Sequence, residues 1–285
     1  MNKGRINRIK DTCFKYVGVF ACFIGLILLA IFIGNILYDG LTRIDWQFLT
    51  SLPSRKAEKA GILTAWSGSL WVISFTFLTA VPLGVCAGIY LEEYGKKNKL
   101  TKLLEVNISN LAGVPSVIYG LLGLEIFVRL SNLGSSVLAG SFTLALLILP
   151  IIIVATREAL KAVPSTIRAG SYALGATKWQ TIWHQILPAA SGGILTGVIL
   201  AVSRAVGETA PLIVVGALAY VPFTPENPMD NFTVLPIQIF NWVSRPQHAF
   251  SINAAAAIIV LLMITFALNG IAVYFRNKWQ KKINW

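Results

Sequence analysis

The chain has 285 residues, of which 55% are hydrophobic and only 13% are charged, and its mean hydropathy is +0.69. This composition excludes an ordinary soluble domain and indicates an integral membrane protein. The formal net charge of +12 does not indicate nucleic-acid binding, because the basic residues lie beside apolar segments and not on one face of a soluble domain.

Six apolar segments are long enough to cross a bilayer, which takes about 20 residues in a helix. No recurrent alternation of apolar and polar residues suggests a membrane β-barrel. We therefore predict an all-α integral membrane protein with six transmembrane helices. The segments cover residues 14–38, 66–90, 107–130, 136–155, 190–219 and 252–275.

Lys and Arg residues are concentrated on one set of flanks of these segments, and such residues are retained in the cytoplasm. Both termini are therefore predicted to be cytoplasmic. The expected organisation is a first part, 1–65, with a basic N-terminus, one transmembrane helix and an outer loop. A transmembrane domain, 66–275, and a basic cytoplasmic tail, 276–285, follow.

Prolines and glycines inside the apolar segments predict bends and close packing. Pro82 and Pro115 lack a backbone N–H group, so both are hinge candidates. Gly207 removes side-chain bulk and is a third hinge candidate. Gly193 and Gly197 predict close approach of a neighbouring helix.

The cytoplasmic segment 156–188 is too long for a simple connector. Pro164 can open a short helix, Gly175 can end it in a left-handed turn, and Thr177 with Gln180 can form a capping box for a second helix. We expect Pro188 to separate this pair of helices from the next transmembrane segment.

The second of these helices is expected to carry Trp179, Trp183 and Ile186 along one side, as an apolar ridge. A ridge of this kind can dock into a groove of a partner protein, or it can lie on the membrane surface. The spacing alone leaves both alternatives open.

Arg204 and Glu208 are costly charges within an apolar segment, and such charges usually mark a transport pathway. Arg204 is about 20 Å along its helix, near the middle of the membrane. Four residues apart, the two side chains can touch.

The guanidinium group of Arg204 suits a tetrahedral oxyanion. Glu208 could accept a hydrogen bond from a phosphate hydroxyl, which fully ionised sulfate lacks. The alternative is a pair that fixes helix register.

Glu125 and Arg129 form a second possible pair, near the outer end of the third segment. They could line the outer mouth of a pathway, or Arg129 could simply extend to water with Glu125 as its partner. His184, His248 and the three cysteines lack metal-ligand spacing, so no metal site is predicted.

The outer segment 221–250 is rich in proline, which opposes a regular helix. We expect an irregular loop there that either meets another protein or is a plain surface loop. Its prolines are Pro222, Pro225, Pro228, Pro236 and Pro246.

The cytoplasmic segment resembles the coupling loop of ABC importer permeases. Gly175 and Leu187-Pro188 match that pattern in register, whereas Ala169-Gly170-Ser171 replaces Glu-Ala-Ala and Gln185 takes an Ile position. Residues 112–123 and 203–212 resemble phosphate ABC transporter permeases. Residues 207–212 and 232–240 are more similar to the PstA subunit than to PstC.

This resemblance implies a type I, MetI-like importer permease of a bacterial inner membrane, and a set of partners. They are a PstC-like second permease, two PstB-like ATPases that bind ATP-Mg, and a PstS-like extracytoplasmic phosphate-binding protein. The chain lacks a Gly-x-x-x-x-Gly-Lys-Ser/Thr loop, so we expect no ATP hydrolysis and no cofactor on this subunit.

The resemblance also implies roles for particular residues. The expected substrate pathway contains Ser203, Arg204, Glu208 and Thr209. The residues expected to couple the permease to the ATPase are Ala169, Gly170, Ser171, Gly175, Ala176, Thr177, Trp179, Trp183, Leu187 and Pro188.

Three other functions remain open at this level. An ion-coupled secondary carrier also places charges in the middle of the membrane. An ABC permease for a different oxyanion would share the same loop. A purely structural membrane partner is disfavoured by the cytoplasmic segment.

Overall fold

The computed structural model describes residues 3–96, 98–217 and 220–280, so residues 281–285 of the expected basic tail lie outside it. Over the described residues the chain is helical, with one isolated β-bridge between Ser136 and Asn231. Short 3₁₀- and π-helices are labelled η. The elements are α1 (Lys3–Gly40), η1 (Leu41–Arg43), α2 (Trp46–Thr50), η2 (Ala57–Lys59), α3 (Leu63–Ile89), η3 (Tyr90–Tyr94), α4 (Lys99–Leu111), α5 (Ser116–Gly123), η4 (Leu124–Leu130), α6 (Val137–Lys161), α7 (Ser165–Ala173), α8 (Lys178–Thr181), η5 (Ile182–Ile186), α9 (Leu187–Val206), α10 (Ala210–Val215), α11 (Leu235–Val243) and α12 (His248–Gln280).

Within the described ranges, five helical runs are long and apolar enough to cross a membrane, and a bent pair makes up to six. These numbers confirm the predicted all-α membrane class. The five runs are Lys10–Arg43, Leu63–Tyr94, Val137–Lys161, Lys178–Val206 and His248–Lys278.

The span expected at 107–130 is sharply bent, because α4 and the run α5–η4 meet at 105°. Pro115 is extended there, with φ −54° and ψ 135°, and it has no N–H group to continue the α4 ladder. The Tyr119 hydroxyl donates to the Leu111 carbonyl at 2.8 Å and so satisfies an acceptor at the end of α4. The predicted hinge at Pro115 is thus a sharp bend in this structure.

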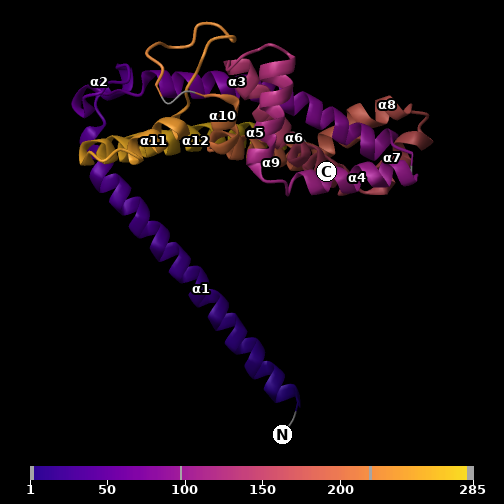
Figure 1. Ribbon diagram of the computed structural model, residues 1–285. Helices are drawn as coiled ribbons and strands as arrows, with labels where there is room; N and C mark the ends of the chain where they lie inside the picture. Colours follow the sequence, from indigo (N-terminus) through magenta and orange to yellow (C-terminus); the bar gives the residue numbers. More distant parts are fainter. Residues whose placement is uncertain (1–2, 97, 218–219, 281–285) are drawn as a thin grey trace.

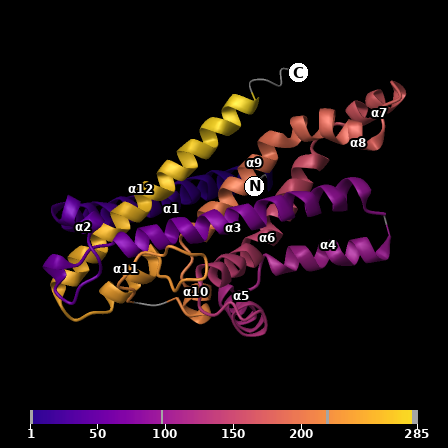
Figure 2. The same cartoon turned by 90° about the horizontal axis from the view of Figure 1, so that it is seen from above.

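The core is built around α6, which is largely buried and packs against both α3 and α9 (Figures 1 and 2). Small residues bring these helices together. Gly84 of α3 lies against Ile152, while Gly193 and Gly197 of α9 lie against Ala159 and Ala155. The close approach predicted from the two α9 glycines is confirmed.

Helix α1 extends away from the other helices and joins them only near its C-terminal end (Figure 1). There Ile36 packs against Ala255 and Ile259 of α12. None of the most apolar 18-residue stretch of α1 is buried within this chain. In a membrane this surface is left to lipid or to another subunit.

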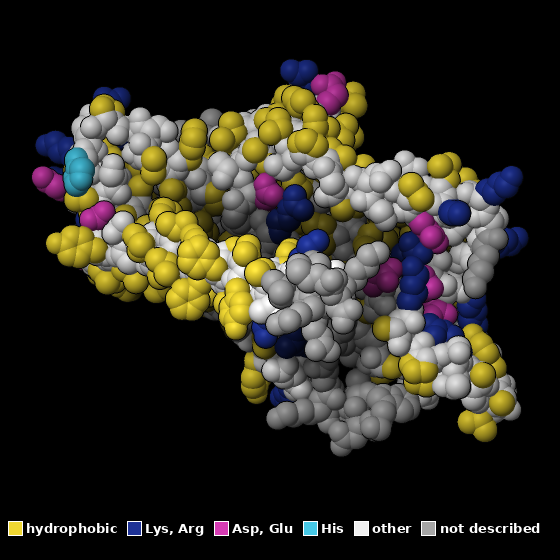
Figure 3. Space-filling model, turned by 90° about the horizontal axis from the view of Figure 1, so that it is seen from below, with side chains coloured by type: hydrophobic (Ala, Val, Ile, Leu, Met, Phe, Trp, Pro, Cys, Tyr) yellow, Lys and Arg dark blue, Asp and Glu magenta, His cyan; other side chains and the backbone are white. Residues whose placement is uncertain are grey.

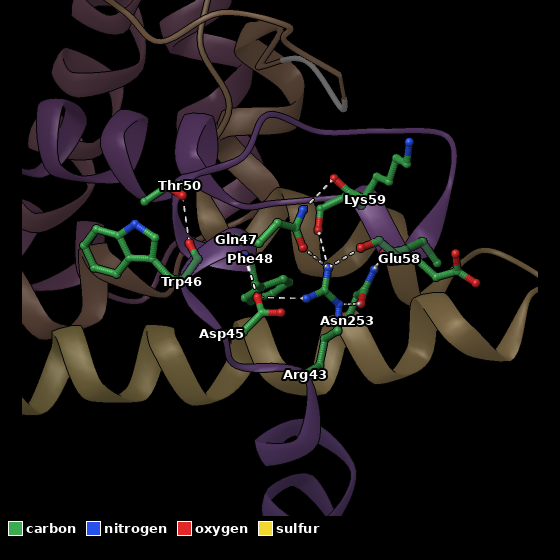
Figure 4. Close-up of polar contacts among 11 residues, drawn as sticks. Arg43, Asp45, Trp46, Gln47, Phe48, Thr50, Glu58, Lys59 and Asn253 are labelled. Atoms are coloured by element: carbon green, nitrogen blue, oxygen red, sulfur yellow. Dashed lines mark hydrogen bonds and ion pairs between the residues drawn. The ribbon is translucent and has the colours of Figure 1, made fainter.

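Arg43 ties the outer segment to α12 (Figure 4). Its Nε donates to Asn253 Oδ1 at 3.1 Å, and its Nη atoms donate to Asp45, Gln47 and the backbone carbonyls of residues 58 and 60. Asn253 in turn donates to a backbone carbonyl of η2 at 2.8 Å. A largely buried arginine with this many partners is structural and holds the loop between α1 and α3 in place.

The proline-rich outer segment is not wholly irregular, because it contains α11. Pro236 occupies the first turn of that helix, where a missing N–H group costs nothing. The loop before α11 is held by Asp230, which accepts from the backbone N–H groups of Glu226 and Asn227 at 2.9 Å. These bonds, that of Asn227 first, lower the pKa of the Asp230 carboxyl below its usual range.

Adding a side chain at Gly197 is expected to disrupt the α6–α9 contact. A Cβ there would overlap the Cβ of Ala155, whereas a Cβ on Gly270 of α12 meets nothing within 4 Å. We expect Gly197→Val to cost about 1–3 kcal/mol of unfolding free energy, measured by thermal unfolding of the purified permease in detergent. Gly270→Val is the matched control, because both changes put valine into a helix. Equal melting temperatures for the two variants would contradict this packing.

Candidate functional site

The span expected at 190–219 is interrupted, so Glu208 does not lie on a continuous helix. Helix α9 ends at Val206, Gly207 follows, and α10 begins only at Ala210. The physical reason is Pro211, whose ring would clash with the Gly207 carbonyl, four residues earlier, in an unbroken helix. Residues 218–219, at the end of the expected span, lie outside the described residues.

Arg204 and Glu208 nevertheless meet, as predicted. The Nε of Arg204 lies 3.3 Å from Oε1 of Glu208. The Arg204 side chain is 43% exposed and that of Glu208 16% exposed. Within the described part of the chain, this is the one hydrogen bond of the guanidinium group. The four N–H donors on its two terminal nitrogens are therefore available to an oxyanion. Two oxygens of such an anion can accept parallel hydrogen bonds from them.

The pair lies next to a second helix break. Helix α10 packs against α5, where Gly120 lies close to Pro211 and Val214. Glu208 lines a small crevice together with Ser69 of α3 and Leu144 of α6. Interrupted helices are tolerated at membrane depth where they are buried in protein or line a cavity, and transporters use them to build polar sites.

Ser203 and Thr209 are placed differently from the pair. The Ser203 hydroxyl oxygen lies within hydrogen-bond distance of Asn269 Oδ1 of α12 and of the Ile199 carbonyl, which share its one hydrogen, so it joins two helices. Thr209 is half-buried at the start of α10, and its carbonyl accepts from the N–H group of Ile213 at 3.1 Å. The structure therefore brings Arg204 and Glu208 together but engages Ser203 with α12.

Glu125 and Arg129 also pair, with Oε2 and Nη1 3.0 Å apart on the π-helical run η4. Both side chains are more than half exposed. In residues 3–96, 98–217 and 220–280, no hydrogen bond or ion pair joins them to Arg204 or Glu208.

The three hinge candidates have different surroundings. Pro115 lies in the break between α4 and α5, and Gly207 lies in the break between α9 and α10. Pro82 lies inside α3, which continues through it from Leu63 to Ile89 without a break. Two of the three thus mark interruptions of the backbone.

The segment 156–188, which we expect to be cytoplasmic, contains the two predicted short helices. Gly175 adopts φ +81° after α7, and the predicted capping box of Thr177 and Gln180 is confirmed at the start of α8. The hydroxyls of Ser171 and Thr181 lie 2.9 Å apart and join α7 to α8.

Pro188 does not separate this pair from the next span, contrary to expectation. Helices α8, η5 and α9 form one run from Lys178 to Val206. The π-helical turn Ile182–Ile186 directly precedes the proline. Such a widened turn changes the hydrogen-bond register and so accommodates a residue that cannot donate.

The predicted apolar ridge is only partly correct. Trp179 and Trp183 are exposed and stack with ring centroids 5.5 Å apart, but Ile186 is fully buried in the core. Leu174, which the helical spacing does not mark, is 90% exposed beside Gly175. The sequence does place a leucine directly before the left-handed turn at Gly175. Helical periodicity, however, does not predict whether a side chain at the end of a helix points to solvent or to the core.

Charged side chains attach α7 and α8 to the core. Arg168 of α7 donates to Glu93 Oε1 at 2.7 Å and to the carbonyls of Leu160 and Val163 at 2.9 and 2.8 Å. Lys178 of α8 lies 4.8 Å from the centre of the Tyr94 ring. Both connections reach η3, at the end of α3, so α7 and α8 are held against the same element.

A second ionic junction lies beside the first. Arg157 of α6 pairs with Glu92 of η3 at 3.4 Å and with Glu105 of α4 at 2.8 Å. No sequence pattern marks Arg157, Arg168 or their acidic partners as a cluster. Their side chains are brought together from segments 65 and 75 residues apart in the hydrogen-bonded pairs, so no local spacing could predict them.

Comparisons with known sequences agree with this architecture. Residues 80–281 match the family model described as "Binding-protein-dependent transport system inner membrane component". The probable ABC transporter permease protein YqgI of Bacillus subtilis is 30% identical over 265 residues, covering 88% of this chain and 90% of that protein. The phosphate transport system permease protein PstA of Mycobacterium leprae is 32% identical, covering 95% and 89%. Its counterpart from Haemophilus influenzae is also 32% identical, covering 90% of each.

Solved structures share the fold. A chain of a bacterial alginate ABC transporter matches with a TM-score of 0.70 at 15% identity, covering 96% of this chain and 98% of that chain. A chain of the MetNI methionine ABC transporter matches with a TM-score of 0.60 at 18% identity, covering 76% and 95%. The predicted MetI-like importer fold and the resemblance to PstA-type permeases are thereby confirmed. The chain belongs to the binding-protein-dependent inner membrane components, the non-enzymatic permease subunits of ABC transporters, in which a separate subunit carries the ATPase.

Proposed function

We propose that this chain is the PstA-type permease of an ATP-driven importer of inorganic phosphate. It forms half of the pathway with a PstC-like permease, above two PstB-like ATPases, and receives phosphate from a PstS-like binding protein. The named phosphate permeases that align with most of the chain support this choice of solute. The observation that carries the proposal is the Arg204–Glu208 pair beside two interrupted helices.

The proposed location is a bacterial inner membrane, with both termini in the cytoplasm. The excess of Lys and Arg at one set of helix ends supports this orientation. It places α7 and α8 on the cytoplasmic side, where ATP is available. It places α2, α11 and the loop before α11 on the outer side, where a binding protein delivers the solute.

At the pair, phosphate competes with Glu208 for Arg204. The existing contact is a single bond through Nε, which leaves the terminal nitrogens for two phosphate oxygens. Glu208, mostly buried beside them, can accept the hydroxyl hydrogen that phosphate carries near neutral pH. Fully ionised sulfate has no such hydrogen, and its charge would face an unpaired carboxylate.

Coupling to the ATPase runs through the exposed surface around Gly175. Leu174, Trp179 and Trp183 are exposed there, with the two tryptophan rings stacked on each other, and they suit an apolar groove. Ala169, Gly170 and Ala176 are small residues on the same segment. Because Arg168 fastens α7 to η3 and to the end of α6, a push on this surface moves α3 and α6 with it.

The Arg204→Ala variant of the complete transporter is expected to lower phosphate uptake into ATP-loaded proteoliposomes by about 10- to 100-fold, since charged hydrogen bonds contribute about 1.5–3 kcal/mol. Glu208→Gln is expected to retain uptake but to make it sensitive to excess sulfate. The matched controls Arg129→Ala and Glu125→Gln change the second, exposed pair. Unchanged uptake in Arg204→Ala, or uptake driven by an ion gradient without ATP, would overturn the proposal.

Two substitutions at Gly175 separate backbone strain from docking. The left-handed φ penalises both Ala and Asp by about 1 kcal/mol, and a Cβ at this position meets no neighbour within 4 Å. We expect Gly175→Asp to abolish phosphate-stimulated ATP hydrolysis, because it puts a charge into an apolar contact, and Gly175→Ala to retain most of it. Equal losses in the two variants would mean that the turn matters for its shape alone.

Removing the Arg168 anchor should loosen α7. Arg168→Gln loses charged hydrogen bonds to Glu93, so we expect backbone amides of residues 165–173 to exchange hydrogen at least tenfold faster. Hydrogen exchange with mass spectrometry on the purified complex measures this. Arg129→Gln, which breaks an exposed pair elsewhere, should leave α7 unchanged. Equal exchange in Arg168→Gln and wild type would show that α7 is held by other contacts.

A further inference from the structure

A cavity of about 830 Å³ opens beside the junction of Arg157 with its two glutamates. It lies between η3, α4 and the end of α6, next to the attachment of α7. Its basic side chains are Lys96, Lys99, Lys102, Arg157 and Lys161, and its acidic ones are Glu92 and Glu105. This volume is within the usual range for small-molecule sites, about 300–1,000 Å³.

The cavity carries an excess of positive charge. Both glutamates are already paired with Arg157, and Lys161 pairs with Glu158, which does not line the cavity. Lys96, Lys99 and Lys102 form no ion pair within the described residues. Because the single charge of Arg157 offsets only one of the two glutamates, the three lysines face this opening against one remaining carboxylate charge, and the excess of positive charge attracts an anion.

Arg157 adds a buried donor to the wall of this cavity. Its side chain is only 8% exposed, and its Nε has no hydrogen-bond partner in the part of the chain that the structure describes. The Nε atom is itself closed to solvent, so a ligand in the cavity meets Arg157 through the other atoms of its guanidinium group, whose N–H donors suit a phosphate oxygen.

The helix that carries two of the lysines also has an exposed apolar side. Leu100, Leu103 and Leu104 of α4 are exposed and alternate along the helix with Lys99 and Lys102. Figure 3 likewise shows Lys and Arg side chains gathered with acidic ones over one end of the molecule, with hydrophobic side chains close by. A basic opening beside an apolar helix side fits a molecule with a charged head and hydrocarbon tails.

We propose that this cavity binds the phosphate group of an anionic membrane lipid, whose acyl chains lie along the leucines of α4. The phosphate oxygens accept from Lys99, Lys102 and Arg157, and the bound lipid holds η3, α4 and α6 together. Because η3 also carries the Glu93 anchor of α7, the lipid stiffens the base of the coupling segment. The site is separate from the Arg204–Glu208 pair and does not depend on which solute is transported.

The test is the thermal stability of the purified full-length permease in detergent, titrated with phosphatidylglycerol, with phosphatidylcholine and with inorganic phosphate. The double variant Lys99→Gln/Lys102→Gln is compared with Lys10→Gln/Lys15→Gln, which removes equal charge from α1. Each basic side chain near anionic lipid contributes about fivefold to binding. We therefore expect the cavity variant to need roughly 30-fold more phosphatidylglycerol for half of the stabilisation, and the α1 variant to match wild type.

Without lipid, both double variants must melt at the wild-type temperature. If the Lys99→Gln/Lys102→Gln variant does not, a single Lys99→Gln variant replaces it, and we expect about a fivefold effect from that change. Stabilisation by inorganic phosphate with the same lysine dependence would keep the phosphate-group site but assign it to the free ion. Equal responses of the two double variants, or equal stabilisation by phosphatidylcholine, would overturn the proposal.

Discussion

The structure depends on one constraint, which is that a backbone inside a membrane must satisfy its own hydrogen bonds unless neighbouring protein does so. Pro115 and Pro211 cannot donate, so α4 ends at Leu111 and α9 ends at Val206. The short helices that follow these breaks, α5 and α10, pack against each other. Arg204 and Glu208 lie at the break between α9 and α10.

A second group of charges lies at the other end of the core. Arg157 and Arg168 join η3, α4, α6 and α7 through carboxylates and helix-end carbonyls. The Arg157–Glu105 and Arg168–Glu93 contacts, at 2.8 and 2.7 Å, are shorter than the exposed Glu125–Arg129 pair at 3.0 Å, and their arginines are better shielded from solvent, so salt and water screen them less. The proposed coupling surface is therefore attached to the helices that lead to the Arg204–Glu208 region, and the proposed lipid site lies in the same junction.

Tertiary packing also explains where the sequence-based expectations failed. Pro188 was expected to end a helix, but a π-helical turn before it allows the run to continue. Ile186 has the spacing of the expected surface ridge, yet it is buried. The run from η5 into α9 packs this side of the helix against the core. Pro236 opens α11 instead of preventing it, since the first turn of a helix does not need its N–H group.

The sequence by itself determined the membrane class, the apolar segments, the capping box at Thr177 and the contact between Arg204 and Glu208. These depend on composition or on neighbours within four residues, so local rules suffice. Only the tertiary structure decided the 105° bend, the meeting of α5 with α10, and the cavity of lysines around Arg157. Those features join side chains from distant segments, and the physical reason is that their positions follow from helix packing, which no spacing along the chain encodes.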